Sequence, residues 1–117
     1  GWAGCPPGKY QNELGQCELL ETGRLVVAGQ NELLAGSALE TDVCVMNAID
    51  FAGVSLKEAI DMTSRNPAKI LGYETVRLRR GALADLIVFR MSQVRKRLDI
   101  EATIGSGQLM FGEIVLR

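Results

Sequence analysis

The stretch that decides the fold lies between residues 34 and 89. Its informative pieces, in order, are Leu34-Ala35-Gly36-Ser37-Ala38-Leu39, Gly53-Val54-Ser55-Leu56-Lys57-Glu58-Ala59, Asn66-Pro67-Ala68, Leu71-Gly72 and Gly81-Ala82-Leu83-Ala84-Asp85-Leu86-Ile87-Val88-Phe89. The first three pieces carry signals for the start of a helix, and the last is an apolar run typical of a strand. The stretch therefore predicts helices followed by a strand.

Two serines in this stretch have the spacing of a capping box. Ser37 precedes Glu40 by three residues, and Ser55 precedes Glu58 by the same distance. In such a box the serine hydroxyl accepts a backbone amide while the glutamate reaches back to the serine amide. Each box predicts that a helix begins beside it.

Other residues complete the helical pattern from residue 37 to residue 72. Gly53 offers a left-handed C-cap, and Asn66 is a good N-cap for a short helix that has Pro67 at its first position and stops at Gly72. Apolar residues recur at near-helical spacing: Leu39, Val43, Met46 and Ile49 in the first helix, then Leu56, Ala59 and Ile60 in the second.

Strand patterns flank the helices on both sides. Residues 1–9 are rich in glycine and proline and predict a loop; residues 17–21 and 24–27 predict a hairpin around Thr22-Gly23, and residues 29–31 the next turn. After the helices, residues 75–78, 84–89, 98–104 and 109–116 have strand composition. The chain therefore predicts an α/β arrangement of three segments: a loop and short strands over 1–36, helices over 37–72, and strands over 73–117. Since this order is not a repeating βαβ pattern, we expect strands from both ends to meet in one sheet.

Composition excludes several classes of partner. The chain has 117 residues, a net charge of -1 and no run of about 20 apolar residues, so neither nucleic acid nor a membrane is an expected partner. Three cysteines without a C-x-x-C spacing, Cys5, Cys17 and Cys44, predict buried thiols and a reduced, cytoplasmic setting. The basic runs 77–80 and 95–97 lie close to acidic residues and predict a solvated face.

No catalytic or metal-binding residue can be assigned from the residue types. The chain has no histidine, its cysteines are scattered, and its serines follow no nucleophile motif. One segment remains a candidate for binding: residues 34–37, where a glycine-containing turn is expected to open into a helix N-terminus. Free amides there can meet an acceptor from a ligand, or Ser37 can simply cap them.

The succession from residue 34 to residue 89 resembles the C-terminal part of an amidohydrolase-superfamily enzyme, and most of all the N-acetylglucosamine-6-phosphate deacetylases. The resemblance implies the last helices of a (β/α)8 barrel plus strands of an accessory β-sandwich. It implies that Leu34, Ala35, Gly36 and Ser37 line the pocket for an amino sugar, and that residues 1–10 follow the last barrel strand, with a catalytic aspartate just before Gly1. A divalent metal, zinc or iron, is implied for the full enzyme and none for this chain, which is predicted to be inactive alone. One departure from the family pattern is Val76, where the family usually has glycine.

Two functions remain open from the sequence. The chain is either part of a metal-dependent amidohydrolase that cleaves an N-acetyl amide, or a non-catalytic interaction module of mixed α and β structure. In the first case the apolar helix faces need covering, so the expected partner is an N-terminal barrel portion or a second copy of the chain.

Overall fold

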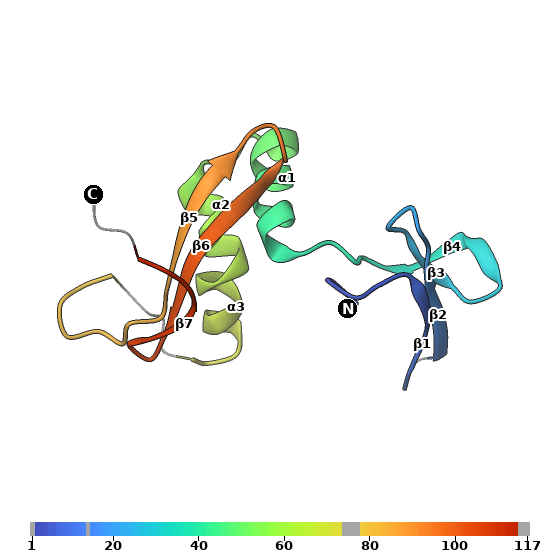
Figure 1. The fold of residues 1–117 in the computed structure, drawn as a ribbon, viewed down its shortest axis with the longest axis horizontal. Coiled ribbons are helices and arrows are strands. Elements are labelled where there is room, and N and C mark those ends of the chain that lie inside the picture. Colours follow the sequence, from blue (N-terminus) through green and yellow to red (C-terminus); the bar gives the residue numbers. More distant parts are fainter. Residues whose placement is uncertain (1, 14, 74–77, 115–117) are drawn as a thin grey trace. The chain divides into compact units, whose positions relative to one another are not determined.

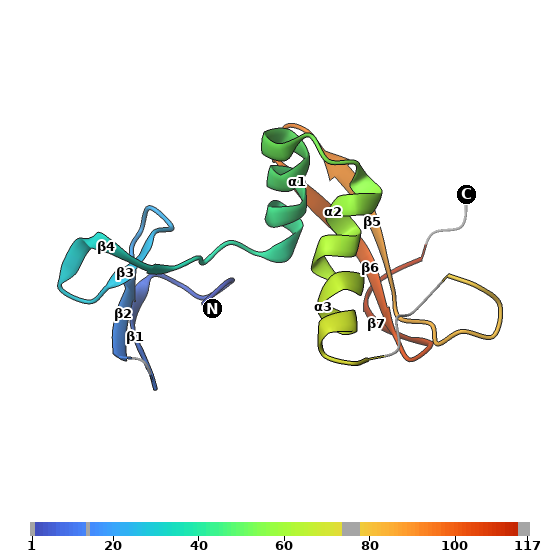
Figure 2. The same cartoon turned by 180° about the vertical axis from the view of Figure 1, so that it is seen from behind.

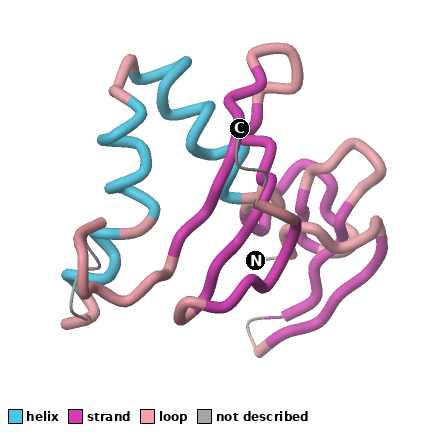
Figure 3. The backbone as a smooth tube through the Cα atoms, turned by 60° about the vertical axis from the view of Figure 1, so that its left-hand side comes forward, coloured by secondary structure: helices cyan, strands magenta, loops and turns pink. Residues whose placement is uncertain are grey.

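The computed structural model describes residues 2–13, 15–73 and 78–114. The chain divides into two compact units, Gly1–Glu40 and Thr41–Arg117, and each is described by itself. All the helices that the described residues form belong to the second unit (Figure 3). None of these helices is long and apolar enough to cross a membrane.

The first unit is an antiparallel sheet of four strands in sequence order (Figure 1). Its strands are β1 (Gly8–Asn12), β2 (Gly15–Leu19), β3 (Leu25–Val27) and β4 (Gln30–Gly36). The hairpin predicted around Thr22-Gly23 is confirmed, because Leu19 pairs with Leu25 and Cys17 with Val27 across it. Gly23 closes the turn with a φ of 80°, and its N–H donates to the Leu20 carbonyl at 2.9 Å.

The core of the first unit is small. Cys17, Leu19 and Leu25 form its buried cluster, and Val26 on β3 is also buried. Four partly buried side chains pack against them: Trp2, Cys5, Tyr10 and Ala38. The core therefore joins the N-terminal loop, the β2–β3 hairpin and the residues that follow β4.

The second unit places three helices beside a three-stranded antiparallel sheet. The helices are α1 (Thr41–Ala52), α2 (Leu56–Thr63) and α3 (Arg65–Ile70), and the strands β5 (Leu86–Ser92), β6 (Arg97–Gly105) and β7 (Gln108–Gly112) are paired in that order. Figures 1 and 2 show α1 and α2 alongside β5 and β6 from opposite sides. Val45, Met46, Ala59 and Leu98 form the buried core between the helices and β6.

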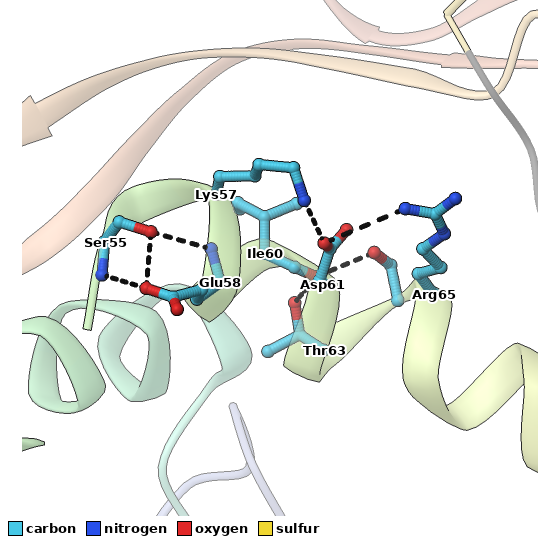
Figure 4. Close-up of polar contacts among 8 residues, drawn as sticks. Ser55, Lys57, Glu58, Ile60, Asp61, Thr63 and Arg65 are labelled. Atoms are coloured by element: carbon cyan, nitrogen blue, oxygen red, sulfur yellow. Dashed lines mark hydrogen bonds and ion pairs between the residues drawn. The ribbon is translucent and has the colours of Figure 1, made fainter.

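The capping box predicted at Ser55 is confirmed (Figure 4). The Ser55 hydroxyl accepts the Glu58 N–H at 3.3 Å, and the Glu58 carboxylate accepts the Ser55 N–H at 2.8 Å. One turn further on, Asp61 pairs with Lys57 and lies 4.0 Å from Arg65. These contacts define where α2 begins and support its exposed face.

The capping box predicted at Ser37 is wrong. The first helix begins at Thr41, and the Ser37 hydroxyl accepts the N–H of Leu39 at 3.2 Å. The reason is the preceding strand, because β4 stays extended to Gly36 in order to pair with β3. Leu39 consequently lies outside the helix and is exposed, so the predicted apolar stripe starts with Val43.

The third helix also begins earlier than predicted. Ser64 is its N-cap residue, so Asn66 lies within the helix and Pro67 is its third residue. Proline is tolerated in a first turn because the N–H groups there have no helical partner. The left-handed C-cap predicted at Gly53 is confirmed, because Gly53 has a φ of 66° and its N–H donates to the Ile49 carbonyl at 3.0 Å. The third helix ends at Ile70, and Gly72 two residues later has a φ of 76°.

The expectation that strands from both chain ends share one sheet is wrong for the described residues. β1 to β4 pair with one another, and β5 to β7 form a separate sheet. Short turns join neighbouring strands within each sheet, and closing a short loop has a small entropic cost. Of the strand predicted over 75–78, the first three residues lie outside the described residues, and Leu78 lies in a bend.

Both units leave much apolar surface exposed. The solvent-accessible area is 9030 Å². A compact protein of 12.7 kDa has about 6,200 Å², and the same mass in two separate globules roughly 7,400 Å². Large apolar side chains that remain exposed include Leu33, Leu34, Phe51, Ile70, Leu109, Met110 and Phe111.

Candidate substrate-binding segment

Residues 34–37 form the end of β4 and the first residue after it. Leu25 pairs with Gly36 and Val26 with Leu34, so Ala35 is an extra residue with no counterpart on β3. Such a bulge bends the strand and re-aims the groups beside it. Gly36 has a φ of 154°, which L-residues rarely adopt, although a Cβ there would meet only Leu25 Cδ2 at 3.6 Å. Backbone conformation, and not lack of space, therefore favours glycine at this position.

The segment is exposed along its whole length. β4 lies at the edge of its sheet, every residue of the strand is exposed, and Leu34 has 61% of its surface accessible. An edge strand presents a row of N–H and C=O groups that are not used in its own ladder. The amides that we expected at a helix N-terminus are therefore offered from a bulged strand edge instead.

The structure brings the N-terminal loop next to this segment. Ala38, directly after it, packs in the same core cluster as Trp2 and Cys5. A Cβ on Gly4 would lie 3.3 Å from a carboxylate oxygen of Glu40. The N-terminal loop and the segment 34–37 therefore belong to one compact unit and adjoin each other.

An aromatic pair organises the N-terminal loop. Trp2 stacks on Tyr10 with ring centroids 4.6 Å apart and planes inclined by 21°. The Tyr10 hydroxyl donates to the Pro6 carbonyl, which closes the loop over the pair. Partial burial raises the pKa of Tyr10 above its ordinary value, so the phenol is a neutral hydrogen-bond donor at pH 7. Sequence analysis missed this pair, although two of the few aromatic residues flank the Pro-Pro step.

The chemistry available in the described part of the chain is binding chemistry. It contains no group of three His, Cys, Asp or Glu side chains that could hold a metal ion. With no histidine in the chain, its serine hydroxyls also lack the usual general base. The 34–37 segment and the loop can supply backbone hydrogen bonds, a hydroxyl and aromatic surface.

Three basic residues of the second unit form ion pairs with acidic residues. A guanidinium nitrogen of Arg97 on β6 lies 2.6 Å from the carboxylate of Asp42 on α1, whose side chain is only 10% exposed. Lys96 pairs with Asp50 at the other end of α1 at 2.7 Å, and Arg95 pairs with Asp99. All three residues of the basic run 95–97 are thus matched by acids, as predicted for a solvated face.

Comparison with known proteins identifies the class. Residues 17–110 match the amidohydrolase family. The match covers most of the chain, and the chain therefore belongs to the amidohydrolase family.

Its relatives within that class are deacetylases of amino-sugar phosphates. The chain is 33% identical over 106 residues to human N-acetylglucosamine-6-phosphate deacetylase and 31% identical over 106 residues to the rat protein, with 89% of this chain and 25% of each relative covered. It is 39% identical over 74 residues to N-acetylgalactosamine-6-phosphate deacetylase of Escherichia coli O157:H7, covering 63% of this chain and 19% of that protein. The chain thus spans about a quarter of the length of the mammalian relatives.

Proposed function

We propose that this chain forms part of an amidohydrolase that cleaves the N-acetyl amide of an amino-sugar 6-phosphate. The observation that carries the proposal is sequence identity: 33% to an N-acetylglucosamine-6-phosphate deacetylase and 39% to an N-acetylgalactosamine-6-phosphate deacetylase. In this proposal the full protein hydrolyses the amide, and the chain lines part of the pocket for the sugar.

The substrate contacts that we assign to this chain come from Leu34, Ala35, Gly36 and Ser37. Their bulged, exposed strand edge can offer backbone N–H and C=O groups to the polar N-acetyl and hydroxyl groups of a sugar. The adjoining loop with Trp2 and Tyr10 can add aromatic surface and a wall. These contacts would orient a substrate without taking part in bond cleavage.

The hydrolytic step itself is not assigned to this chain. A divalent metal, zinc or iron, would lower the pKa of a water molecule and polarise the amide carbonyl when bound. The described residues do not fit such an ion, because they hold no cluster of suitable ligands. Metal ligands and the general acid or base are therefore proposed to lie in an N-terminal barrel portion of the full protein, which would also cover the exposed apolar surfaces.

The alternative of a non-catalytic interaction module is less favoured, because the chain belongs to a family of hydrolases. We place the enzyme in the cytoplasm, since Cys5, Cys17 and Cys44 are all free thiols and a reducing compartment preserves that state.

The test uses the complete open reading frame that contains this chain. Release of acetate from N-acetylglucosamine 6-phosphate and from N-acetylgalactosamine 6-phosphate is measured for the wild type and for Gly36→Val. We expect the variant to raise KM at unchanged metal content, because valine disfavours the backbone conformation of Gly36 and would distort the bulged edge. Gly15→Val is the matched control, since its φ of 132° is also unfavourable for valine, and Gly15 is the first residue of β2, outside residues 34–37.

Three results would contradict parts of the proposal. Absence of acetate release from either sugar phosphate by the full protein would exclude the activity. An unchanged KM in Gly36→Val, or an equal rise in Gly15→Val, would remove residues 34–37 from the pocket. Turnover by the 117-residue chain alone with added zinc or iron would show that it carries its own hydrolytic groups.

A further inference from the structure

Tyr10 joins the N-terminal loop to the sheet of the first unit. Its backbone belongs to β1 and pairs with Cys17 of β2, so the strand ladder fixes the base of the side chain. From there the ring stacks on Trp2 with centroids 4.6 Å apart, and the hydroxyl donates to the Pro6 carbonyl. The hydroxyl also interacts with the Cys5 thiol, which adds to partial burial in raising the pKa of Tyr10. One side chain therefore contacts the loop at three residues.

A tight turn shapes the loop itself. The Cys5 N–H donates to the Trp2 carbonyl at 3.1 Å, and Gly4 has a φ of 74°, the sign that a type II turn requires at its third residue. This turn is a local interaction, and residues 2–7 form no strand that would pair with the sheet. The stacked ring and the hydroxyl bond of Tyr10 therefore contribute directly to holding the loop on the sheet.

The same loop lies against the residues that follow the candidate segment. Trp2 and Cys5 pack against the cluster to which Ala38 also contributes. A Cβ on Gly4 would lie 3.3 Å from a carboxylate oxygen of Glu40. Residues 38–40 continue directly from the segment 34–37, so the loop stands beside the chain that leaves this segment.

We propose that Tyr10 is a positioning residue of the sugar site, whose ring and hydroxyl hold the N-terminal loop in place as a wall beside residues 34–37. This inference rests on the proposed function, because it assigns a role within that site. Tyr10 acts through the loop and takes no part in bond cleavage. Loss of its contacts therefore lowers the fraction of molecules whose loop is in place, which weakens substrate binding and leaves the chemical step unchanged.

The first measurement follows the loop and needs no substrate. The protein encoded by the complete open reading frame is treated with iodoacetamide, and alkylation is followed in tryptic peptides. Trypsin cuts after Lys9 and Arg24, so Cys5 and Cys17 fall in different peptides. In Tyr10→Phe, which keeps the ring and removes the hydroxyl, half-buried Cys5 should react about 2- to 10-fold faster, the range expected for loss of one hydrogen bond. Buried Cys17 should stay slow and report that the unit remains folded.

The second measurement follows the site. KM and kcat are determined for acetate release from N-acetylglucosamine 6-phosphate by the same protein. We expect KM to rise about 2-fold in Tyr10→Phe and further in Tyr10→Ala, which also removes the stacking on Trp2, while kcat stays unchanged in both. Tyr73→Phe is the matched control, because it removes the same hydroxyl from an exposed tyrosine of the other unit and should change neither constant.

Each contrary outcome overturns the proposal for a different reason. An unchanged alkylation rate at Cys5 in Tyr10→Phe would show that the hydroxyl bond does not hold the loop. An equal acceleration at Cys17 would show that Tyr10 supports the whole unit and not the loop. Faster alkylation of Cys5 with an unchanged KM in both Tyr10 variants would separate the loop from the site. Absence of acetate release would refute the proposed function and this role with it, and that failure is distinguishable because it appears in the wild type.

Discussion

Replacing Met46 by alanine tests whether the second unit has its own core. Met46 lies on α1 with 0% of its surface exposed, and it shares a buried cluster with Val45, Ala59 and Leu98. Partly buried Phe89 and Ile100 pack against the same cluster. These contacts join helices α1 and α2 to β5 and β6, so the substitution weakens the only buried cluster that the structure describes for this unit.

The expected loss of stability follows from the size of the cavity. Truncating a buried Met to Ala destabilises proteins by about 2–5 kcal/mol, and less where the neighbours can collapse into the space. With only four buried residues in the cluster, we expect collapse to be easy and the loss to be about 2–3 kcal/mol. Met62→Ala is the matched control, because Met62 lies on α2 with 53% of its surface exposed; a change within about 0.5 kcal/mol is expected.

Two spectroscopic signals separate the units in urea unfolding. The far-UV circular dichroism of helices reports the second unit, which holds every helix that the described residues form. Fluorescence of Trp2, the one tryptophan of the chain, reports the first unit. Met46→Ala should lower the midpoint of the helical transition and leave the Trp2 transition in place. Equal midpoints for Met46→Ala and Met62→Ala would refute the assignment of Met46 to a core.

Three further predictions concern turns, pH and association. Ser106 and Gly107 have φ of 50° and 80° in the β6–β7 turn, which is the pattern of a type I′ turn. Because asparagine adopts positive φ more readily than serine, Ser106→Asn should raise the free energy of unfolding by about 0.5–1 kcal/mol. An unchanged thermal midpoint would contradict this. Hydrogen bonds from Ser55 lower the pKa of Glu58 below its ordinary 4.5, and Lys57 lowers the pKa of Asp61 below its ordinary 3.8. The two carboxylates therefore stabilise the folded chain fully above those ordinary values. This stabilisation is lost as the pH falls through the lower folded-state pKa values. The helix signal should therefore fall more on acidification in the wild type than in Glu58→Gln; identical acid titrations would argue against the capping box. The exposed apolar side chains predict that the isolated chain self-associates, and a single monomeric species in sedimentation equilibrium over a wide concentration range would show otherwise.

The two capping boxes show what local sequence can predict. Ser55 and Glu58 form the predicted reciprocal hydrogen bonds because Gly53 has already ended α1 and nothing competes for residues 55–58. The same spacing at Ser37 fails because the preceding residues are held by a strand ladder with β3. A cap is a local interaction, whereas a ladder depends on a partner strand that sequence spacing does not reveal.

Strand pairing shows the same limit of prediction from local sequence, over longer distances along the chain. The hairpin around Thr22-Gly23 was predictable, because a two-residue turn signal and two flanking apolar runs are adjacent in sequence. The division of the strands into two sheets was not predictable, since strand composition is similar at both ends of the chain and does not indicate which strands pair. Residues 34–37 were identified through a family resemblance, and their bulge and edge position emerged only from the pairing with β3.

The location of the candidate segment follows from how the first unit folds. β2 and β3 supply its buried cluster, and the partly buried side chains that pack against this cluster come from the N-terminal loop, from β1 and from Ala38 just after β4. This small core links the N-terminal loop to the residue that follows the segment 34–37, because Trp2, Cys5 and Ala38 pack against the same cluster. A substitution at Trp2, Cys5 or Tyr10 should therefore change the conformation of residues 34–37 through Ala38, even if the substituted residue does not contact a ligand. For this reason a sugar pocket built on the bulged edge of β4 would depend on the N-terminal loop for its shape as well as for its wall.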